Sequence, residues 1–181
     1  MSNDNSFIRP EEFWRTLGLR AGQSVVHLGC GPGFYLLPAA KLVGSAGKAI
    51  GVDVRSDMLA EAENRARRDS NATVITTIRA DLEQAAGSTL PAASADWVLV
   101  ANILHQSDPA KIMAEAKRIV HEAGKIVVVE WDVVATPMGP PPTVRIFKND
   151  VVTLAESLGL ALEKSFAPSP YHYGLVLTVA A

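Results

Sequence analysis

The glycine-rich segment from Val25 to Tyr35, VVHLGCGPGFY, constrains the fold of this chain more than any other feature. Three glycines, Gly29, Gly31 and Gly33, stand two apart directly after a short apolar run. Because glycine has no Cβ, such a loop turns tightly and lets its backbone approach a ligand closely. A helix that starts at the loop points its amide groups at the same place. The segment therefore predicts a strand, a ligand-binding loop and a helix.

The rest of the chain alternates between short β-rich runs and segments with helical spacing, which is typical of a parallel sheet covered on both faces. A last pair of runs, separated by a Pro-Ser-Pro turn, resembles an antiparallel hairpin. We expect an α/β, Rossmann-like, doubly wound and mostly parallel seven-stranded sheet with one antiparallel strand near its edge. The expected strands are 24–28, 48–54, 73–78, 95–101, 124–131, 160–167 and 171–179, and the expected helices are 9–19, 33–43, 56–68, 108–121 and 148–158.

Two helix starts carry local signals. Ser56 stands where an N-cap is expected for the helix 56–68, because its hydroxyl can accept a hydrogen bond from the first turn. Ser107 or Asp108 is the expected cap of the helix 108–121, with Pro109 in the first turn. The amphipathic helix 9–19 should place Phe13, Trp14 and Leu17 against the core.

Length and composition predict one domain over residues 1–181, with an N-terminal helix region at 1–22 and a Pro-rich flap or connector at 133–147. The formal net charge of −2 gives no sign of nucleic acid or an anionic membrane as a partner. The first residues are polar and no apolar run is long enough to span a bilayer, so we expect a cytoplasmic protein. With Cys30 as the single cysteine, neither an internal disulfide nor a cysteine-based zinc site is possible, and we expect no metal.

An acidic residue strengthens the case for a nucleoside ligand. Asp53 ends the second expected strand, 20 residues after Gly33. A carboxylate at a strand end can accept hydrogen bonds from both hydroxyls of a ribose. The dinucleotide fingerprint is G-x-G-x-x-G, whereas this chain has G-x-G-x-G with Phe34 one place later. A nicotinamide-dependent oxidoreductase is therefore an alternative that the glycine spacing disfavours.

Five segments, HLGCGPG, GVDVRSDML, RADL, DWVLVANILHQ and EAGKIVVVEW, occur in the order and spacing of class I S-adenosylmethionine-dependent methyltransferases. Over about residues 10–135 the chain most resembles the small-molecule branch that includes the ubiquinone/menaquinone-biosynthesis type. The resemblance implies S-adenosyl-L-methionine as cofactor and S-adenosyl-L-homocysteine as product. It also implies cofactor contacts for Gly29, Cys30, Gly31 and Gly33 (methionine part), Asp53 (ribose), Val54 and Met58 (adenine or ribose), Asp81 (adenine amino group) with Leu82, and Asn102 and Ile103 (floor).

Each of these residues has a structural alternative. The glycines can be plain turn residues, Asp53 and Asp81 can cap turns, and Met58 can belong to the core. Cys30 is better explained as a small buried spacer than as a nucleophile, because nothing beside it in the sequence would lower its pKa.

His27 departs from the family pattern, which usually has Asp or Glu at this position to help bind the ammonium group of the methionine moiety. A neutral imidazole can accept a hydrogen bond from that ammonium, whereas a protonated one would repel it. We therefore expect cofactor affinity to fall as the pH drops through the pKa of His27. The alternative is a strand-end histidine bonded to the backbone.

On the acceptor side the candidates are His105 as general base and Glu130 at the end of the fifth strand. Trp131, Arg145 and Tyr173 are candidate substrate contacts. The alternatives are that His105 packs at the sheet edge, that Glu130 pairs with Arg145, and that Tyr173 is a core aromatic.

The resemblance implies methyl transfer to an O, N or C nucleophile of a small molecule by in-line displacement. A non-catalytic cofactor- or partner-binding module on the same fold is one alternative, and a methyltransferase acting on protein or RNA is another. The short chain leaves little room for a lid over the acceptor, so a homo-oligomer is also an open alternative.

Overall fold

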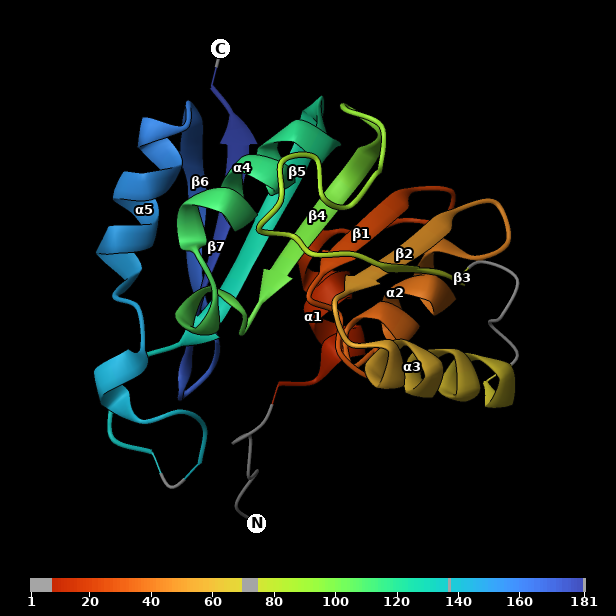
Figure 1. The fold of residues 1–181 in the computed structure, drawn as a ribbon, viewed down its shortest axis with the longest axis horizontal. Coiled ribbons are helices and arrows are strands. Elements are labelled where there is room, and N and C mark those ends of the chain that lie inside the picture. Colours follow the sequence, from red (N-terminus) through yellow and green to blue (C-terminus); the bar gives the residue numbers. More distant parts are fainter. Residues whose placement is uncertain (1–7, 70–74, 137, 181) are drawn as a thin grey trace.

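A computed structural model describes residues 8–69, 75–136 and 138–180 and contains one seven-stranded sheet in the order β3-β2-β1-β4-β5-β7-β6 (Figure 1). The strands are β1 Ser24–Leu28, β2 Lys48–Asp53, β3 Ile75–Arg79, β4 Ala95–Ala101, β5 Val120–Trp131, β6 Leu160–Ser169 and β7 His172–Val179. The helices are α1 Pro10–Leu17, α2 Leu36–Val43, α3 Ser56–Arg68, α4 Pro109–Ile119 and α5 Lys148–Ser157, with 3₁₀ turns η1 Leu104–Gln106 and η2 Pro142–Val144.

The direction of the strands confirms the predicted topology. Strands β3, β2, β1, β4 and β5 run parallel to one another, whereas β7 pairs antiparallel with both β5 and β6. The reversed strand is thus second from the edge. The chain leaves β3 at one edge and returns to β4 beside β1, so the strand order reverses between β1 and β4. Ligands of such sheets bind beyond the carboxyl ends of the strands at this point.

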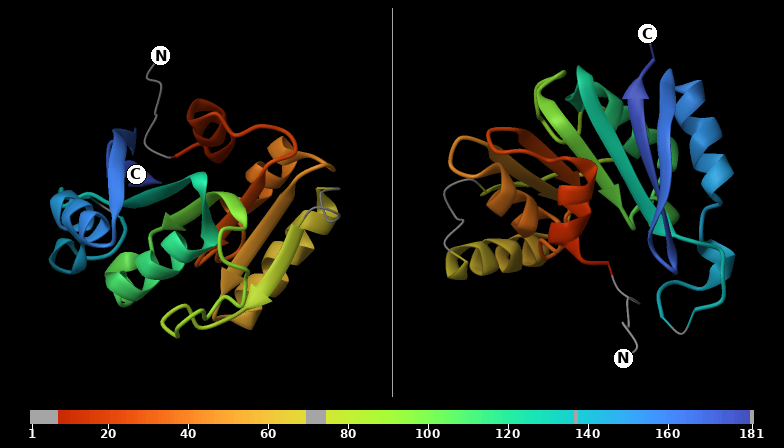
Figure 2. Two further views of the ribbon diagram at one scale, coloured as in Figure 1. Left: turned by 90° about the horizontal axis from the view of Figure 1, so that it is seen from above. Right: turned by 180° about the vertical axis from the view of Figure 1, so that it is seen from behind.

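The helices cover both faces of the sheet (Figure 2). On one face α4 and α5 pack against the strands through a core that includes Met113, Val128 and Val151. On the other face α1 and α2 pack through a core that includes Trp14 and Val127, and α3 joins α2 at the edge. Burial on both faces explains why the central strands are apolar runs and not alternating ones.

Helix α1 anchors the N-terminal part to the glycine loop. Phe13 and Trp14 are buried and Leu17 packs beside them, as predicted. The Trp14 Nε1 donates a hydrogen bond to the Tyr35 carbonyl at 2.9 Å. The helix ends because Gly18 adopts φ 89°, the left-handed conformation typical of a helix C-terminus.

Several element ends differ from prediction. Ser56 is the first residue of α3 and no side chain caps that helix, so the predicted cap is wrong. Helix α2 begins at Leu36 and not at residue 33, because the loop continues as turns. Asp108 does cap α4, accepting the Ala110 N–H at 3.0 Å. Residues 73 and 74 of the predicted third strand, and residues 1–7 of the N-terminal region, lie outside the described residues.

No helix in the described part of the chain has the length and apolar character needed to cross a membrane.

Candidate functional site

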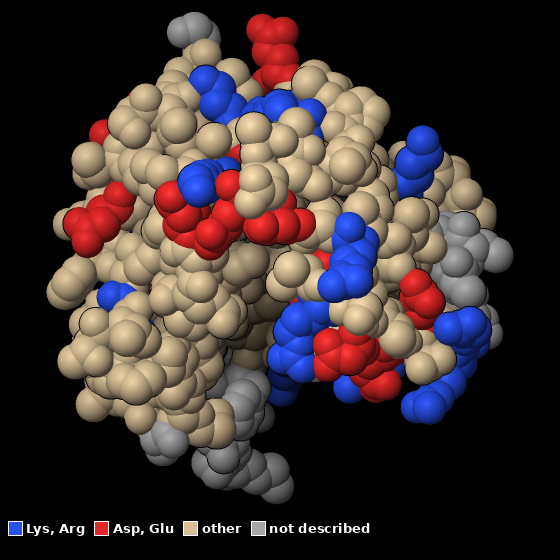
Figure 3. Space-filling model, in the orientation of Figure 1, with Lys and Arg blue, Asp and Glu red and all other residues tan. Residues whose placement is uncertain are grey.

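A cavity of about 540 Å³ lies beyond the carboxyl ends of the parallel strands. The loops after β1, β2, β3 and β4 all contribute to it, because these ends meet where the strand order reverses. Figure 3 shows a hollow on this side of the molecule, with charged side chains gathered along one flank. The lining residues are Gly29, Gly31, Asp53, Val54, Arg55, Met58, Ala80, Asp81, Leu82, Glu83, Asn102, Ile103, Gln106, Ser107 and Ile112.

The three glycines of the loop have different structural roles. Gly29 has φ +70°, and a Cβ built there would lie 2.4 Å from Ile103 Cδ1. Gly31 has φ +51° and nothing within 4 Å of such a Cβ, so its backbone borders open space. A Cβ on Gly33 would instead meet Leu37 and Ala62 at 3.2 and 3.3 Å. Gly29 and Gly31 thus line the cavity, whereas Gly33 lets two helices pack closely.

The side chain of Cys30, a residue of the loop, is buried and does not line the cavity. Its Sγ donates weakly to the Gly31 carbonyl at 3.5 Å. Burial, together with the charge of Asp53, raises the pKa of this thiol to about 12. The thiol therefore stays protonated, which supports the spacer interpretation.

Two aspartates at the cavity wall hold loop backbone and keep acceptor capacity for a ligand. The Asp53 Oδ2 accepts the Gly31 N–H at 2.8 Å and its Oδ1 accepts the Arg55 N–H at 2.9 Å. The Asp81 Oδ1 accepts the Glu83 N–H at 3.0 Å, and its Oδ2 accepts from Gln84 Nε2 at 3.1 Å. The Gln84 and Glu83 hydrogen bonds lower the pKa of Asp81. Because a carboxylate oxygen has two lone pairs, each still has room for a further donor.

Asn102 forms the floor of the cavity in a strained conformation. Its φ is +54°, in the left-handed region that Asn tolerates better than most residues. Its N–H donates to the Val129 carbonyl at 2.8 Å, whereas its buried Oδ1 has no hydrogen-bond partner among the described residues. Strained backbone and an unpaired buried acceptor together are typical of functional sites.

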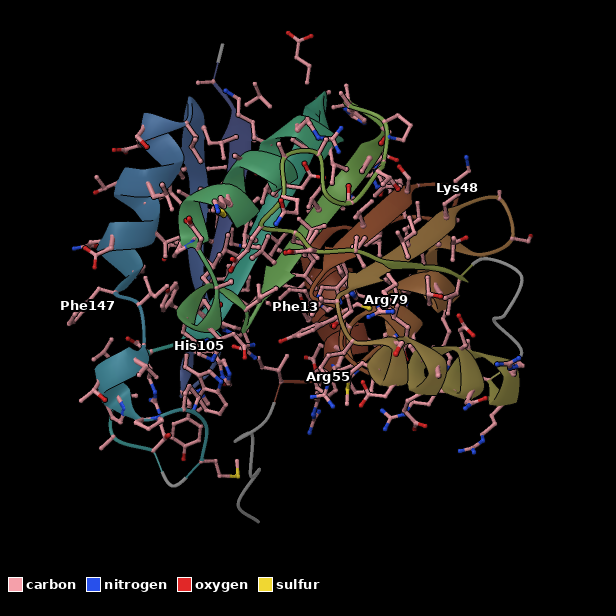
Figure 4. All side chains as sticks on the ribbon, viewed as in Figure 1. Phe13, Lys48, Arg55, Arg79, His105 and Phe147 are labelled. Carbon is pink, nitrogen blue, oxygen red and sulfur yellow. The ribbon has the colours of Figure 1, made fainter. Side chains whose placement is uncertain are left out.

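His105 and Glu130, 25 residues apart in the chain, form a hydrogen-bonded pair at the ends of β4 and β5. His105 Nδ1 lies 2.9 Å from Glu130 Oε2, and the other carboxylate oxygen accepts the Leu104 N–H at 2.7 Å. The Glu130 side chain is 1% exposed and that of His105 is 12% exposed. Figure 4 shows His105 in the loop that follows β4, near the carboxyl ends of β4 and β5.

Arg145 does not serve as an anion-binding residue and does not pair with Glu130. All five of its N–H donors are used within the segment that follows β5, and its guanidinium lies over the Trp131 ring at 5.3 Å. The acceptors are the carbonyls of Asp132, Val134, Met138 and Pro140 and the Thr136 Oγ1. The predicted substrate contact is therefore wrong, because no donor remains for a ligand.

The other two acceptor-side candidates lie in packed surroundings. Tyr173 is buried and its hydroxyl donates to the Ile146 carbonyl at 3.1 Å, so it is a core aromatic. Trp131 is half-buried, and its ring is covered by Arg145, Gly139 and His172. Neither residue lines the cavity. Arg145 ties described residues of the Pro-rich segment 133–147 to Trp131 and the end of β5, which favours the connector interpretation over a free flap.

A second hollow of about 590 Å³ lies between α1 and β6 and shares no lining residue with the first. It contains neither the glycine loop nor a strand-end acid, so it lacks the residues that predicted a nucleoside ligand. Within the described ranges there is no group of three or more His, Cys, Asp or Glu placed to hold a metal ion.

Comparison with known proteins decides the family. Residues 19–159 match the family model described as a methyltransferase domain. This chain belongs to the class I S-adenosylmethionine-dependent methyltransferases. The cofactor of that family is S-adenosyl-L-methionine, as the sequence motifs implied.

Curated relatives of this methyltransferase chain match about two thirds of it. Aklanonic acid methyltransferase DauC of Streptomyces sp. strain C5 is 29% identical over 124 residues, 64% of this chain and 54% of that protein. The ubiquinone/menaquinone biosynthesis C-methyltransferase UbiE of Hahella chejuensis is 26% identical over 122 residues, 67% of this chain and 48% of its own length. An uncharacterized protein of a Streptomyces fradiae transposon is 36% identical over 64% of this chain and 33% of its own length. The chain therefore spans a third to about half of these relatives.

Solved structures match over nearly the whole methyltransferase chain. A SAM-dependent methyltransferase from Aquifex aeolicus superposes with a TM-score of 0.87 at 24% identity, covering 97% of this chain and 92% of that one. A Sulfolobus solfataricus protein provisionally described as a type 11 methyltransferase gives a TM-score of 0.77 at 27% identity, covering 97% and 95%. These likenesses confirm the Rossmann-like fold.

The residues present fit this cofactor. The cavity of about 540 Å³ is within the range of small-molecule sites, and a Cβ on Gly31 would enter its open space. Asn102, which lines it, has a buried Oδ1 that no described residue hydrogen-bonds. Sequence reasoning missed six lining residues, which adjoin predicted ones in the same loops or begin the next helix: Arg55, Ala80, Glu83, Gln106, Ser107 and Ile112.

His27 does not line the methyltransferase cavity. It lies between Gly51 and Leu99 in the sheet, is 2% exposed, and its ring meets that of Tyr35 edge-on at 5.8 Å. Neither ring nitrogen has a hydrogen-bond partner among the described residues. Burial lowers the pKa of His27 to about 3, so the ring is neutral at pH 6 and at pH 8. The expected loss of affinity on acidification across this range therefore does not follow, and the backbone-bonded alternative is also wrong.

Proposed function

We propose that the chain binds S-adenosyl-L-methionine in the 540 Å³ cavity and transfers its methyl group to a small-molecule nucleophile by in-line displacement. One observation carries the proposal. Of the twelve residues to which the family resemblance gave a cofactor role, nine line this single cavity although they come from four separate loops. His27, Cys30 and Gly33 are the three that do not.

The chain's own residues would hold the cofactor. Asp53 would accept from the ribose hydroxyls, and Asp81 and Leu82 would border the adenine, with Met58 and Val54 packing beside it. When bound, the cofactor supplies a methyl group on a positively charged sulfur that leaves readily, so the protein mainly aligns the acceptor and excludes water.

The charge of the cavity supports this cofactor over a dinucleotide. Its lining carries three acids, Asp53, Asp81 and Glu83, and one base, Arg55. Arg55 is engaged by Asp57, with its Nη2 2.6 Å from Asp57 Oδ2. A sulfonium and an ammonium are attracted to such a wall, whereas the pyrophosphate of a nicotinamide dinucleotide would meet Arg55 as the one cation among the described lining residues.

A small-molecule acceptor is supported by two relatives. DauC is named for aklanonic acid and UbiE for ubiquinone and menaquinone biosynthesis. Because this chain spans 54% and 48% of those proteins, the acceptor of the present chain is inferred here at the level of a small molecule only.

The test is calorimetric titration of the purified chain with S-adenosylmethionine, S-adenosylhomocysteine and NADH at pH 6 and pH 8. We expect binding of the first two alone, with equal affinity at both pH values because His27 stays neutral. Asp53→Asn should weaken binding about tenfold, because an amide loses one acceptor, and this corresponds to about 1.4 kcal/mol. Binding of NADH alone, or of none of the three, would contradict the proposal.

A further inference from the structure

The His105–Glu130 pair fixes which ring nitrogen of His105 can take a proton. Its Nδ1 faces the Glu130 carboxylate at 2.9 Å. That carboxylate is buried and its other oxygen is held by the Leu104 N–H, so the side chain cannot turn away without leaving an amide unpaired. A carboxylate only accepts hydrogen bonds, and in the neutral ring the proton therefore resides on Nδ1.

The second nitrogen is left free. Nε2 of His105 has no hydrogen-bond partner among the described residues. Unlike the two ring nitrogens of His27, it is open to solvent. Ile103 and Gln106, on either side of His105 in the chain, line the cofactor cavity. His105 itself does not line that cavity, but the same short loop after β4 carries it, so its unpaired basic nitrogen lies close to the cavity wall. This arrangement, a base oriented by a buried carboxylate, is how enzymes position a general base.

We propose that His105 is the general base of methyl transfer, that Glu130 is its positioning residue, and that the acceptor is a small molecule with a phenolic or enolic hydroxyl; this rests on the proposed function. The hydroxyl proton passes to His105 Nε2 as an oxygen lone pair forms the new bond to the methyl carbon. The carbon–sulfur bond breaks and its electron pair stays on sulfur, which gives S-adenosylhomocysteine. The imidazolium then returns its proton to water.

The acceptor class follows from what an imidazole can deprotonate. A phenol has a pKa of about 10, close enough to that of imidazole for assistance in the transition state. A carboxylate is already ionised and a neutral amine attacks through its own lone pair, so neither requires a base before attack. An aliphatic hydroxyl is far less acidic than a phenol, so an imidazole assists its attack less than that of a phenol.

The chain contains a matched control. His121 and Asp96 form a second histidine–carboxylate pair, with Nε2 3.0 Å from Asp96 Oδ1, at the opposite ends of β4 and β5. His121→Gln removes a histidine at the amino end of β5, and His121 does not line the cavity. In this pair it is Nε2 that faces the carboxylate, so the two rings should carry their protons on opposite nitrogens.

The first measurement is ¹⁵N NMR of the imidazole rings in the full chain. We expect the Nδ1–H form for His105 and the Nε2–H form for His121. An Nε2–H form of His105 would overturn the proposal, because the free nitrogen could not then accept a proton.

The second measurement compares three probe acceptors with S-adenosylmethionine at pH 8, following release of S-adenosylhomocysteine. They are 4-methylphenol, 4-nitrophenol, which is largely ionised at this pH, and 4-methylaniline. For 4-methylphenol we expect kcat to fall by about 10² to 10⁴ in His105→Gln, with cofactor affinity unchanged. For 4-nitrophenol the fall should be much smaller, because its proton is lost before binding. Glu130→Gln should show the same contrast to a smaller degree, and Glu130→Asp should recover part of the rate.

The outcomes separate the two proposals. An equal fall in kcat for the two phenols in His105→Gln would mean that the His105–Glu130 pair only stabilises the loop after β4, which would overturn the general-base role. Turnover of the aniline alone, or of no phenol while the cofactor binds, would overturn the acceptor class and leave cofactor binding intact. Failure to bind S-adenosylmethionine would instead refute the proposed function.

Discussion

The two ends of strands β4 and β5 each hold a histidine–carboxylate pair, and the two pairs do different work. At the carboxyl ends, Glu130 is 1% exposed and serves one ring and one loop amide. At the amino ends, Asp96 is 32% exposed and accepts from the Ser24 N–H and Oγ at 2.7 and 2.6 Å as well as from His121. Asp96 thus ties β1 to β4 and β5, whereas Glu130 orients a side chain beside a cavity.

The same two residue types take their role from their surroundings. Burial by itself would raise the pKa of Asp96, but the hydrogen bonds from Ser24 and His121 outweigh it and lower that pKa. A carboxylate that accepts hydrogen bonds from three groups in this way stabilises the sheet and does not orient a side chain toward the cavity. We therefore expect changes at the amino ends to affect stability and changes at the carboxyl ends to affect binding and turnover.

The largest effect should come from the glycines that flank β1. Gly29→Ala should weaken S-adenosylmethionine binding about 100-fold, or about 2.7 kcal/mol, because the new Cβ would lie 2.4 Å from Ile103 Cδ1 and push that side chain into the cavity. Gly22→Ala, at the other end of β1, also has a positive φ of +84° but nothing within 4 Å. It should cost about 1 kcal/mol of stability and leave calorimetric affinity unchanged. Equal affinity losses in both variants would contradict the expected difference between the two ends of β1.

The next effect concerns the buried His27. The folded state keeps this ring neutral down to about pH 3, whereas the unfolded chain takes up a proton below about pH 6.5, so stability is lost as the pH falls between these values. From pH 7.5 to pH 5.0 the loss from this one group is about 2 kcal/mol, at 1.36 kcal/mol per pH unit. His27→Gln should remove that loss in urea unfolding measured at both pH values.

His172, whose pKa burial and the Arg145 charge lower to about 4, contributes in the same direction and is present in both proteins. The difference between wild type and His27→Gln therefore isolates His27. An unchanged pH dependence in the variant would show that the ring is protonated in the fold.

The smallest effect should come from Asp96→Asn. The variant loses charged acceptors for Ser24 and His121, and we expect a loss of about 1 kcal/mol in urea unfolding at pH 7.5. Because the pKa of Asp96 is lowered in the fold, its contribution is present above the unfolded value of about 3.9 and is lost as the pH falls below it. Affinity for S-adenosylmethionine should not change, and a tenfold change would place the amino ends within the site.

The sequence by itself determined the sheet, the helices on its two faces and the reversed strand, because these follow from local periodicity and from where glycine and proline interrupt it. It also indicated most of the cavity wall. The carboxyl ends of parallel strands meet at one edge, so loops that are far apart in the chain, such as those after Gly29 and Asp53, are brought together by topology alone.

Only the tertiary structure decided the partners of the polar side chains. Arg145 is of a residue type that binds anions, but its five N–H groups all donate to oxygens of its own loop. His27 stands at the position where the family usually has a ligand-binding acid, but its ring is buried against Tyr35. His105 forms its hydrogen bond with Glu130, which belongs to a different strand end. The reason is physical: burial, register and loop closure choose which donor meets which acceptor, and none of the three is a local property of the sequence.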